Sequence, residues 1–183
     1  DLGVFESFSP VIREGDCRSP LVFLGNIHPD LQLKVADMMV SPEYIVSDTM
    51  NLWIDLSPAQ LNSVIKKSDV FLINHEEAIQ FSGLSDVSAA AQMFLEMGPS
   101  VVVIKMGADG SYVAQKNKCF FVPVFPVNKL LDPTGAGDSF AGGFMGYLSQ
   151  TQNPDFIEAV IMGSAMASFC VEGFGVESLL KAT

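Results

Sequence analysis

Residues 132–144 read Asp-Pro-Thr-Gly-Ala-Gly-Asp-Ser-Phe-Ala-Gly-Gly-Phe, and most of what the sequence predicts starts from this stretch. Glycines at 135 and 137 allow a tight loop. Apolar side chains then recur every four residues, at Phe140, Phe144 and Leu148. This spacing indicates a helix directly after the loop. Because the first amides of a helix lack internal acceptors and lie at its positive end, we expect an anion site here.

Asp138 stands at the start of that expected helix, which the spacing predicts over residues 138–149. Beside a bound phosphate, its carboxylate can accept a proton from an attacking hydroxyl group, which is the role of a general base in phosphoryl transfer. The simpler alternative is that Asp138 only caps the helix and that the glycines only form a turn. The residues on both sides of the motif favour the anion site.

The stretch resembles the C-terminal signature of the ribokinase (PfkB-type) family of carbohydrate and nucleoside kinases, Asp-x-Thr-Gly-Ala-Gly-Asp-x-Phe. The resemblance implies an ATP-dependent phosphotransferase that acts on a sugar hydroxyl group or, alternatively, on a nucleoside. It implies that Asp138 is the catalytic base and that Asp132 and Thr134 lie at the nucleotide. The implied anion hole consists of the amides of Gly135, Ala136 and Gly137.

A second part of the resemblance follows an expected strand at residues 69–74. Asn74-His-Glu-Glu77 is similar to the family's Asn-x-x-Glu motif, which implies that Asn74 and Glu77 organise Mg²⁺, partly through water. The chemistry is reasonable because Mg²⁺ keeps several waters and takes few carboxylates. The alternative is that Asn74 caps a helix and that the acidic residues complement the helix dipole.

A third part covers residues 101–110, Val-Val-Val-Ile-Lys-Met-Gly-Ala-Asp-Gly. They resemble the family's strand that ends in a turn under the nucleotide, which implies that Gly107 and Gly110 lie there. Lys105 could then reach a phosphate as a compact point charge. Alternatively, Lys105 is a surface lysine at the end of a strand.

The last expected helix, from about residue 154 to residue 171, is rich in small residues, including Ala165 and Ser168. Core packing is their ordinary role, whereas the resemblance implies that they form a wall for the adenine ring. Gly175 falls in a segment similar to the family's closing nucleotide loop. In some members, carbonyl groups there and near Asp132 and Thr134 hold a monovalent cation, which this sequence leaves open.

Asp48 and Asn51 follow an expected strand at residues 44–47. They could contact the substrate or help to arrange Mg²⁺, because ligand groups gather outside the carboxyl ends of strands. The interpretation that we favour is that they cap and order a loop before the next helix, as Asp and Asn often do. Trp53 is expected to pack in the core.

Strand-like and helix-like segments alternate from residue 21 to residue 105, which predicts an α/β fold with a mostly parallel sheet. The expected strands are 21–24, 44–47, 69–74 and 101–105, and the expected helices are 29–39, 59–66, 87–97 and a short one ending near 81. Residues 111–114 and 119–122 predict an antiparallel hairpin at the sheet edge. The resemblance implies a ribokinase-like three-layer sandwich, in a single domain over residues 1–183.

The composition excludes several other classes. A formal net charge of −11 argues against a nucleic-acid-binding surface. No apolar run reaches the roughly 18 residues of a membrane span, and no Walker phosphate-binding motif occurs. Cys17, Cys119 and Cys170 lie far apart, which predicts reduced thiols, a cytoplasmic protein and no cysteine metal site. The expected partners are a sugar or nucleoside, ATP and Mg²⁺.

The chain opens with Asp1-Leu-Gly-Val-Phe-Glu-Ser-Phe, which resembles the middle of a family member. The family's N-terminal sugar-binding and lid segments have no counterpart, so we expect the C-terminal, nucleotide-binding part of a kinase domain. Such a piece is expected to self-associate through an unpaired sheet edge, as a homo-oligomer or aggregate, and to show little sugar kinase activity. The alternative functions are a catalytically inactive nucleotide-binding fragment and a nucleotide-binding regulatory protein.

Overall fold

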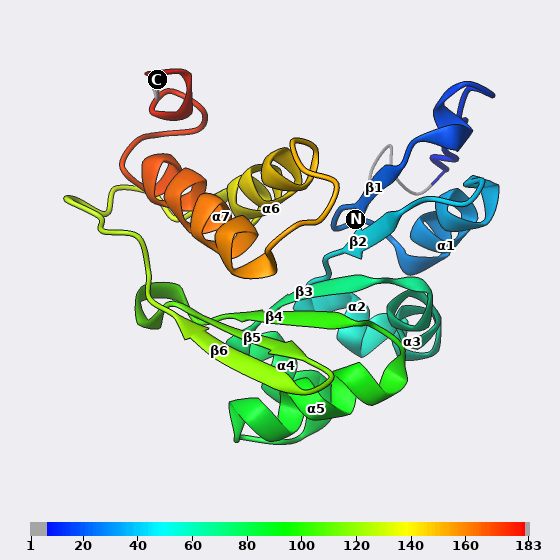
Figure 1. The fold of residues 1–183 in the computed structure, drawn as a ribbon, viewed down its shortest axis with the longest axis horizontal. Helices are drawn as coiled ribbons and strands as arrows, with labels where there is room; N and C mark the ends of the chain where they lie inside the picture. The colour runs from blue at the N-terminus through cyan, green and yellow to red at the C-terminus, as the bar shows by residue number, and fades with distance from the viewer. Residues whose placement is uncertain (1–6, 182–183) are drawn as a thin grey trace.

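The computed structural model describes residues 7–181, which form a six-stranded sheet with helices on both faces (Figure 1). The strands lie side by side in chain order. They are β1 (Leu21–Leu24), β2 (Tyr44–Ser47), β3 (Val70–Asn74), β4 (Val101–Lys105), β5 (Ser111–Gln115) and β6 (Lys118–Val122). β1 to β4 are parallel, and β5 and β6 form an antiparallel hairpin beside β4. The predicted α/β class, the mostly parallel sheet and the antiparallel edge hairpin are confirmed.

Two groups of helices form the outer layers. One face of the sheet is covered by α6 (Ala136–Leu148) and α7 (Phe156–Val171). The other face is covered by α2 (Asn51–Leu56), α3 (Pro58–Lys67), α4 (His75–Ser82) and α5 (Val87–Met97). α1 (Pro29–Met38) packs on β1 and α3. Short 3₁₀ turns occupy Asp16–Arg18, Gly107–Asp109 and Leu179–Lys181.

The central strands are apolar along their whole length because both of their faces are buried. In β3, Val70 and Leu72 face the core beneath α6 and α7, whereas Phe71 and Ile73 face the core beneath the opposite helices. All four side chains are fully buried. A continuous apolar run is typical of a parallel strand between two helix layers, which explains why the sequence predicts these strands.

The helix α2 departs from the prediction of a loop before the next helix. Asn51 begins this helix, and its side chain accepts a hydrogen bond from the amide of Leu52. Trp53 and Ile54 are buried, so the segment is held by packing against α3 and α4 and not by intrinsic helix propensity. The expected burial of Trp53 is confirmed.

The helices α6 and α7 approach each other closely through glycines. A Cβ atom on Gly143 would lie 2.5 Å from the carbonyl oxygen of Met162, and one on Gly163 would lie 2.7 Å from the carbonyl oxygen of Phe140. No side chain fits at either position without movement of the backbone. The expected packing role of small residues in this helix is therefore confirmed for Gly163.

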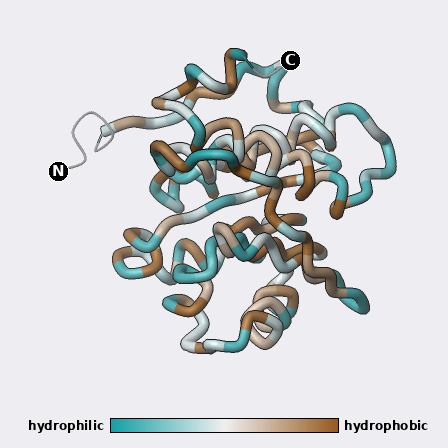
Figure 2. The backbone as a smooth tube through the Cα atoms, turned by 90° about the vertical axis from the view of Figure 1, so that its left-hand side faces the viewer, coloured by the Kyte–Doolittle hydropathy of each residue, from teal (hydrophilic) through white to brown (hydrophobic). Residues whose placement is uncertain are grey.

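Figure 2 shows hydrophobic and hydrophilic residues alternating along the outer helices, as expected of helices with one buried side. Among residues 7–181, no helix is both long enough and apolar enough to cross a membrane. The opening residues Asp1 to Glu6, which carry most of the resemblance to the middle of a family member, lie outside the described part of the chain.

Candidate active site

The carboxyl ends of three neighbouring parallel strands lie side by side, and each end supplies a polar side chain. Asp48 directly follows β2, Asn74 is the last residue of β3 and Lys105 is the last residue of β4. Asn74 and Lys105 are paired across the β3–β4 ladder. Because ligand sites in α/β sheets lie outside the carboxyl ends of the strands, these three strand ends form the candidate site.

Lys105 forms an ion pair with Asp48 at these strand ends. The distance from Lys105 Nζ to Asp48 Oδ2 is 2.7 Å, and the two side chains are only 15% and 9% exposed. A Cβ atom on Gly137 would lie 3.7 Å from Lys105 Nζ, so the ammonium group lies beside the first turn of α6. Lys105 is therefore not a surface lysine, and it joins the strand ends to the glycine-rich loop.

Asn74 and Glu77 form a capping box at the start of α4. Asn74 Oδ1 accepts a hydrogen bond from the Glu77 amide at 2.8 Å, and Glu77 Oε2 accepts one from the Asn74 amide at 3.1 Å. The helix-capping alternative is thus present in the structure. It does not remove Glu77 from the site, because this side chain is 8% exposed whereas Glu76 is exposed.

The pKa of Glu77 is raised above its ordinary value, mainly because burial disfavours the charged form. The hydrogen bond from Asn74 and the positive charge of Lys105 lower the pKa, and the negative charge of Asp48 raises it. Glu77 therefore interacts electrostatically with both members of the ion pair. Among residues 7–181, no group of three or more His, Cys, Asp or Glu side chains is arranged to hold a metal ion.

The glycine-rich loop ends with Gly135 in the left-handed conformation, at φ +81°, and α6 begins at Ala136 and not at Asp138. The Ala136 amide donates a hydrogen bond to the Pro133 carbonyl oxygen at 3.2 Å. The amides of Gly135, Gly137 and Asp138 have no acceptor among the described residues. Asp138 itself is exposed in the first turn of the helix.

The same loop is anchored on the C-terminal end of α7. The amides of Leu131 and Asp132 donate to the Val171 carbonyl oxygen at 2.8 and 3.3 Å. Asp132 Oδ1 accepts a hydrogen bond from the Thr134 amide at 2.9 Å, and this bond lowers the pKa of Asp132. The Asp132 side chain thus shapes the loop that the sequence predicts at the phosphates.

Four other predicted residues lie in turns or have structural roles. Gly110 has φ +91°, and a Cβ atom there would lie 2.3 Å from the Val122 carbonyl oxygen, so it lets the β4–β5 turn pack against the end of β6. Ser168 is buried, and its hydroxyl group donates to the Ala165 carbonyl oxygen at 2.7 Å. Gly107 and Gly175 have positive φ angles in turns, and nothing lies within 4 Å of the position that an added Cβ atom would take.

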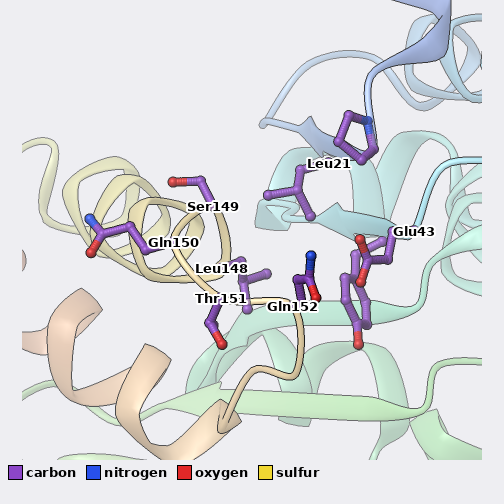
Figure 3. Close-up of a pocket in the computed structure, with 9 residues that line it drawn as sticks. Leu21, Glu43, Leu148, Ser149, Gln150, Thr151 and Gln152 are labelled. Carbon is purple, nitrogen blue, oxygen red and sulfur yellow. The ribbon is translucent and has the colours of Figure 1, made fainter.

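Two hollows lie near the helices α6 and α7. One of about 220 Å³ lies between residues 122–126 and α7, where it is lined by Ile161 and Ser164. The other, of about 230 Å³, lies between the starts of β1 and β2 and the segment after α6, lined by Leu21, Glu43 and Gln152 (Figure 3). The second cavity is at the opposite end of α6 from the glycine-rich loop, so it does not belong to the candidate site.

Sequence reasoning underestimated Asp48. Its signal was weak because Asp at the end of a strand usually orders a loop, and here Asp48 Oδ1 does accept a hydrogen bond from the Thr49 amide at 2.9 Å. Its second oxygen binds a lysine 57 positions later in the chain. A contact at that separation depends on the strand order and cannot be read from a local pattern.

Comparisons with known proteins show which family the chain resembles. Residues 43–182 match the sequence model of the pfkB family of carbohydrate kinases. A cytidine kinase from Thermococcus kodakarensis is 36% identical over 158 residues, which cover 79% of this chain and 54% of that protein. The chain spans about half the length of the curated relatives it matches.

Solved structures that share the fold include two with more than 25% identity. Ribokinase from Thermotoga maritima is 29% identical, with a TM-score of 0.72 over 90% of this chain and 57% of that chain. A protein from E. coli described as a ribokinase II, in complex with ATP and Mg²⁺, is 26% identical, with a TM-score of 0.70 over 80% of this chain and 48% of that chain. The family match covers more than half of the chain and includes all the strand ends and the loop of the candidate site. The chain therefore belongs to the pfkB family of carbohydrate kinases.

Proposed function

We propose that the protein is an ATP-dependent kinase that transfers a phosphoryl group to a hydroxyl group of a sugar. The observation that carries the proposal is the first turn of α6, where the amides of Gly137 and Asp138 have no acceptor within residues 7–181 and the Lys105 ammonium group lies beside Gly137. Free amides at a helix start and a nearby ammonium group suit a phosphate. Membership of the pfkB family supports the same function.

Asp138 is the proposed general base. The substrate hydroxyl group attacks the γ-phosphoryl group and gives its proton to this carboxylate, which is exposed and therefore accessible to the substrate. The amides of Gly135 and Gly137 stabilise the negative charge on the transferring group. The Ala136 amide, the third member of the proposed anion hole, must first release the Pro133 carbonyl oxygen.

Asn74 and Glu77 are the residues that would hold Mg²⁺, partly through its water shell. The donor set fits, because Mg²⁺ takes few carboxylates and Glu77 is a buried carboxylate at the edge of the sheet. The capping box uses Oε2 of Glu77, so Oε1 can accept a hydrogen bond from a metal-bound water. When bound, the cation supplies positive charge to the phosphate groups.

Further nucleotide contacts are proposed at Gly107, Ala165, Ser168 and Gly175, with Gly110, Asp132 and Thr134 shaping the surrounding turns. A monovalent cation has less support. The carbonyl oxygen of Thr134 accepts a hydrogen bond from the Cys170 thiol, and the carbonyl oxygen of Val171 accepts two amide hydrogen bonds. A cation at these oxygens would have to share or displace those bonds.

A nucleoside kinase is the second candidate. The observation that favours it is the 36% identity to the cytidine kinase from Thermococcus kodakarensis. Both candidates use the same chemistry at Asp138 and differ only in the acceptor.

We further propose that residues 1–183 form the nucleotide-binding part of a single kinase domain in a cytoplasmic enzyme, and that the chain can self-associate.

The test is a coupled assay of ADP release, with ATP, Mg²⁺ and a panel of sugars and nucleosides, by the purified chain and by a complete version of the enzyme. Turnover that depends on a sugar supports the proposal, and turnover only with nucleosides supports the second candidate. Nucleotide binding without turnover on any alcohol would favour an inactive nucleotide-binding fragment. Calorimetry with ATP in parallel separates a failure to bind the nucleotide from a failure to transfer the phosphoryl group.

A further inference from the structure

The Lys105–Asp48 ion pair connects the ends of β2 and β4 across the end of β3. Asp48 follows β2 and Lys105 ends β4, while β3 and its terminal residue Asn74 lie between them. The pair is largely removed from water, with an Nζ to Oδ2 distance of 2.7 Å. Such a contact holds the lysine side chain across the strand end, in a direction that brings its ammonium group beside Gly137.

Asp48 is the rigid partner of this pair. Its amide donates to the Leu24 carbonyl oxygen at 3.1 Å, and its own carbonyl oxygen accepts from Gln32 Nε2 at 3.0 Å. Gln32 is 2% exposed, and the same nitrogen also donates to the carbonyl oxygens of Leu24 and Gly25. These bonds fix the backbone at the ends of β1 and β2. A lysine side chain has four flexible bonds, so a fixed carboxylate determines where its charge lies.

A second carboxylate, that of Glu77, lies near the ion pair. The charges of Lys105 and Asp48 both act on the pKa of Glu77. The Glu77 carboxylate accepts its hydrogen bond from the Asn74 amide, whereas the Asp48 carboxylate contacts the Lys105 ammonium group directly. Asp48 is therefore the residue that sets the position of the ammonium group.

We propose that Asp48 is a positioning residue that holds the Lys105 ammonium group beside Gly137, where it meets the terminal phosphates of the nucleotide. This inference rests on the proposed function, because it assigns a partner to the phosphate-binding lysine of that site. Asp48 acts through Lys105 and does not itself touch the nucleotide. Preorganisation of this kind strengthens binding by avoiding the cost of ordering a flexible side chain.

The test compares the binding of ATP and AMP to the purified chain by calorimetry, in the presence of Mg²⁺. Asp48→Asn keeps an oxygen for the Thr49 amide but loses the charge that holds Lys105. We expect it to weaken ATP binding by at least roughly tenfold, as for loss of a hydrogen bond to a charged group, and to leave AMP binding unchanged. The control is Asp37→Asn, which makes the same chemical change in the exposed ion pair with Lys67 and should alter neither.

A double-mutant cycle separates positioning from a merely structural role. In a Lys105→Met background, Asp48→Asn should cause no further loss of ATP affinity, because the group that it positions is gone. An undiminished loss in that background, or an equal loss for ATP and AMP, would overturn the inference. Normal ATP binding by Asp48→Asn would overturn this inference but not the proposed function. A wild-type chain that binds no ATP would overturn both.

Discussion

The thiol of Cys170 on α7 donates a hydrogen bond to the carbonyl oxygen of Thr134, with Sγ and O 3.4 Å apart. A Cβ atom on Gly135 would lie 3.6 Å from the same sulfur. The sulfur therefore packs against the glycine-rich loop, directly before the first turn of α6. The last turn of one helix thus supports the loop that starts another, and this contact must break if the loop opens.

This contact predicts the order in which the three thiols react with iodoacetamide. Cys119 is exposed, Cys17 is half-buried and Cys170 is 3% exposed, so Cys170 should be alkylated last. Its reaction requires the loop to leave α7, and ATP should slow it further by holding the loop in place. Mass spectrometry of a labelling time course measures the order. Fast labelling of Cys170 that ATP does not affect would contradict the contact.

Gly135→Ala should destabilise the fold by about 1–2 kcal/mol, because its φ of +81° is unfavourable for residues with a Cβ atom. Space is not the reason, since the nearest neighbour lies at ordinary contact distance. The matched control is Gly142→Ala within α6, where nothing lies within 4 Å of the added methyl group. That change should stabilise the protein by about 0.5–1 kcal/mol. Urea unfolding of both variants measures the difference.

Gly163→Ala tests the packing of α6 on α7. The added methyl group would lie 2.7 Å from the Phe140 carbonyl oxygen, so the helices must separate. We expect a loss of about 1–3 kcal/mol, as for other overpacked cores. Thermal unfolding checks this value against the same Gly142→Ala control, and an unchanged melting temperature for Gly163→Ala would show that the helices are less tightly packed.

The sequence predicted the regular part of the fold because its signals are local. The strands β3 and β4 are short apolar runs buried on both faces, and the spacing of Phe140, Phe144 and Leu148 predicts α6, although this helix begins two residues earlier than predicted. The helix α2 was missed because six residues are too few to show a helical period, and burial of Trp53 and Ile54 decides their conformation. The ion pair of Asp48 with Lys105 depends on strand order, which no local pattern contains.

Glu77→Gln should change the Mg²⁺ dependence of ATP binding without lowering the stability of the fold. Glutamine can keep the hydrogen bond to the Asn74 amide, and it removes a buried charge, so the free energy of unfolding at pH 7 should stay equal or rise. The apparent Mg²⁺ requirement for ATP binding should increase, because the carboxylate acts on the metal's water shell in the proposed site. A Mg²⁺ titration identical to that of the wild type would leave Glu77 with its capping role alone.

The same variant should change how stability depends on pH. Burial raises the pKa of Glu77 above its ordinary value of 4.5, so the folded chain binds this proton more tightly than the unfolded chain does. The resulting stabilisation is complete below pH 4.5 and is lost as the pH rises through the raised pKa. Relative to Glu77→Gln, the wild type should therefore gain stability as the pH falls from 7 through the raised pKa toward 4.5. Parallel unfolding curves of the two proteins across that range would contradict the raised pKa.

Asp138→Asn tests the chemistry directly. In a complete version of the enzyme, kcat should fall by at least about 10²-fold if Asp138 is the general base, while the affinity for ATP should stay nearly the same because amides and Lys105 make the proposed phosphate contacts. The fold should tolerate the change, since Asp138 is exposed. The matched control is Glu158→Gln, which removes an exposed acidic side chain from the first turn of α7 and should leave kcat unchanged. A kcat for Asp138→Asn close to that of this control would mean that the carboxylate only complements the dipole of α6, and the proton would then have to leave by another route.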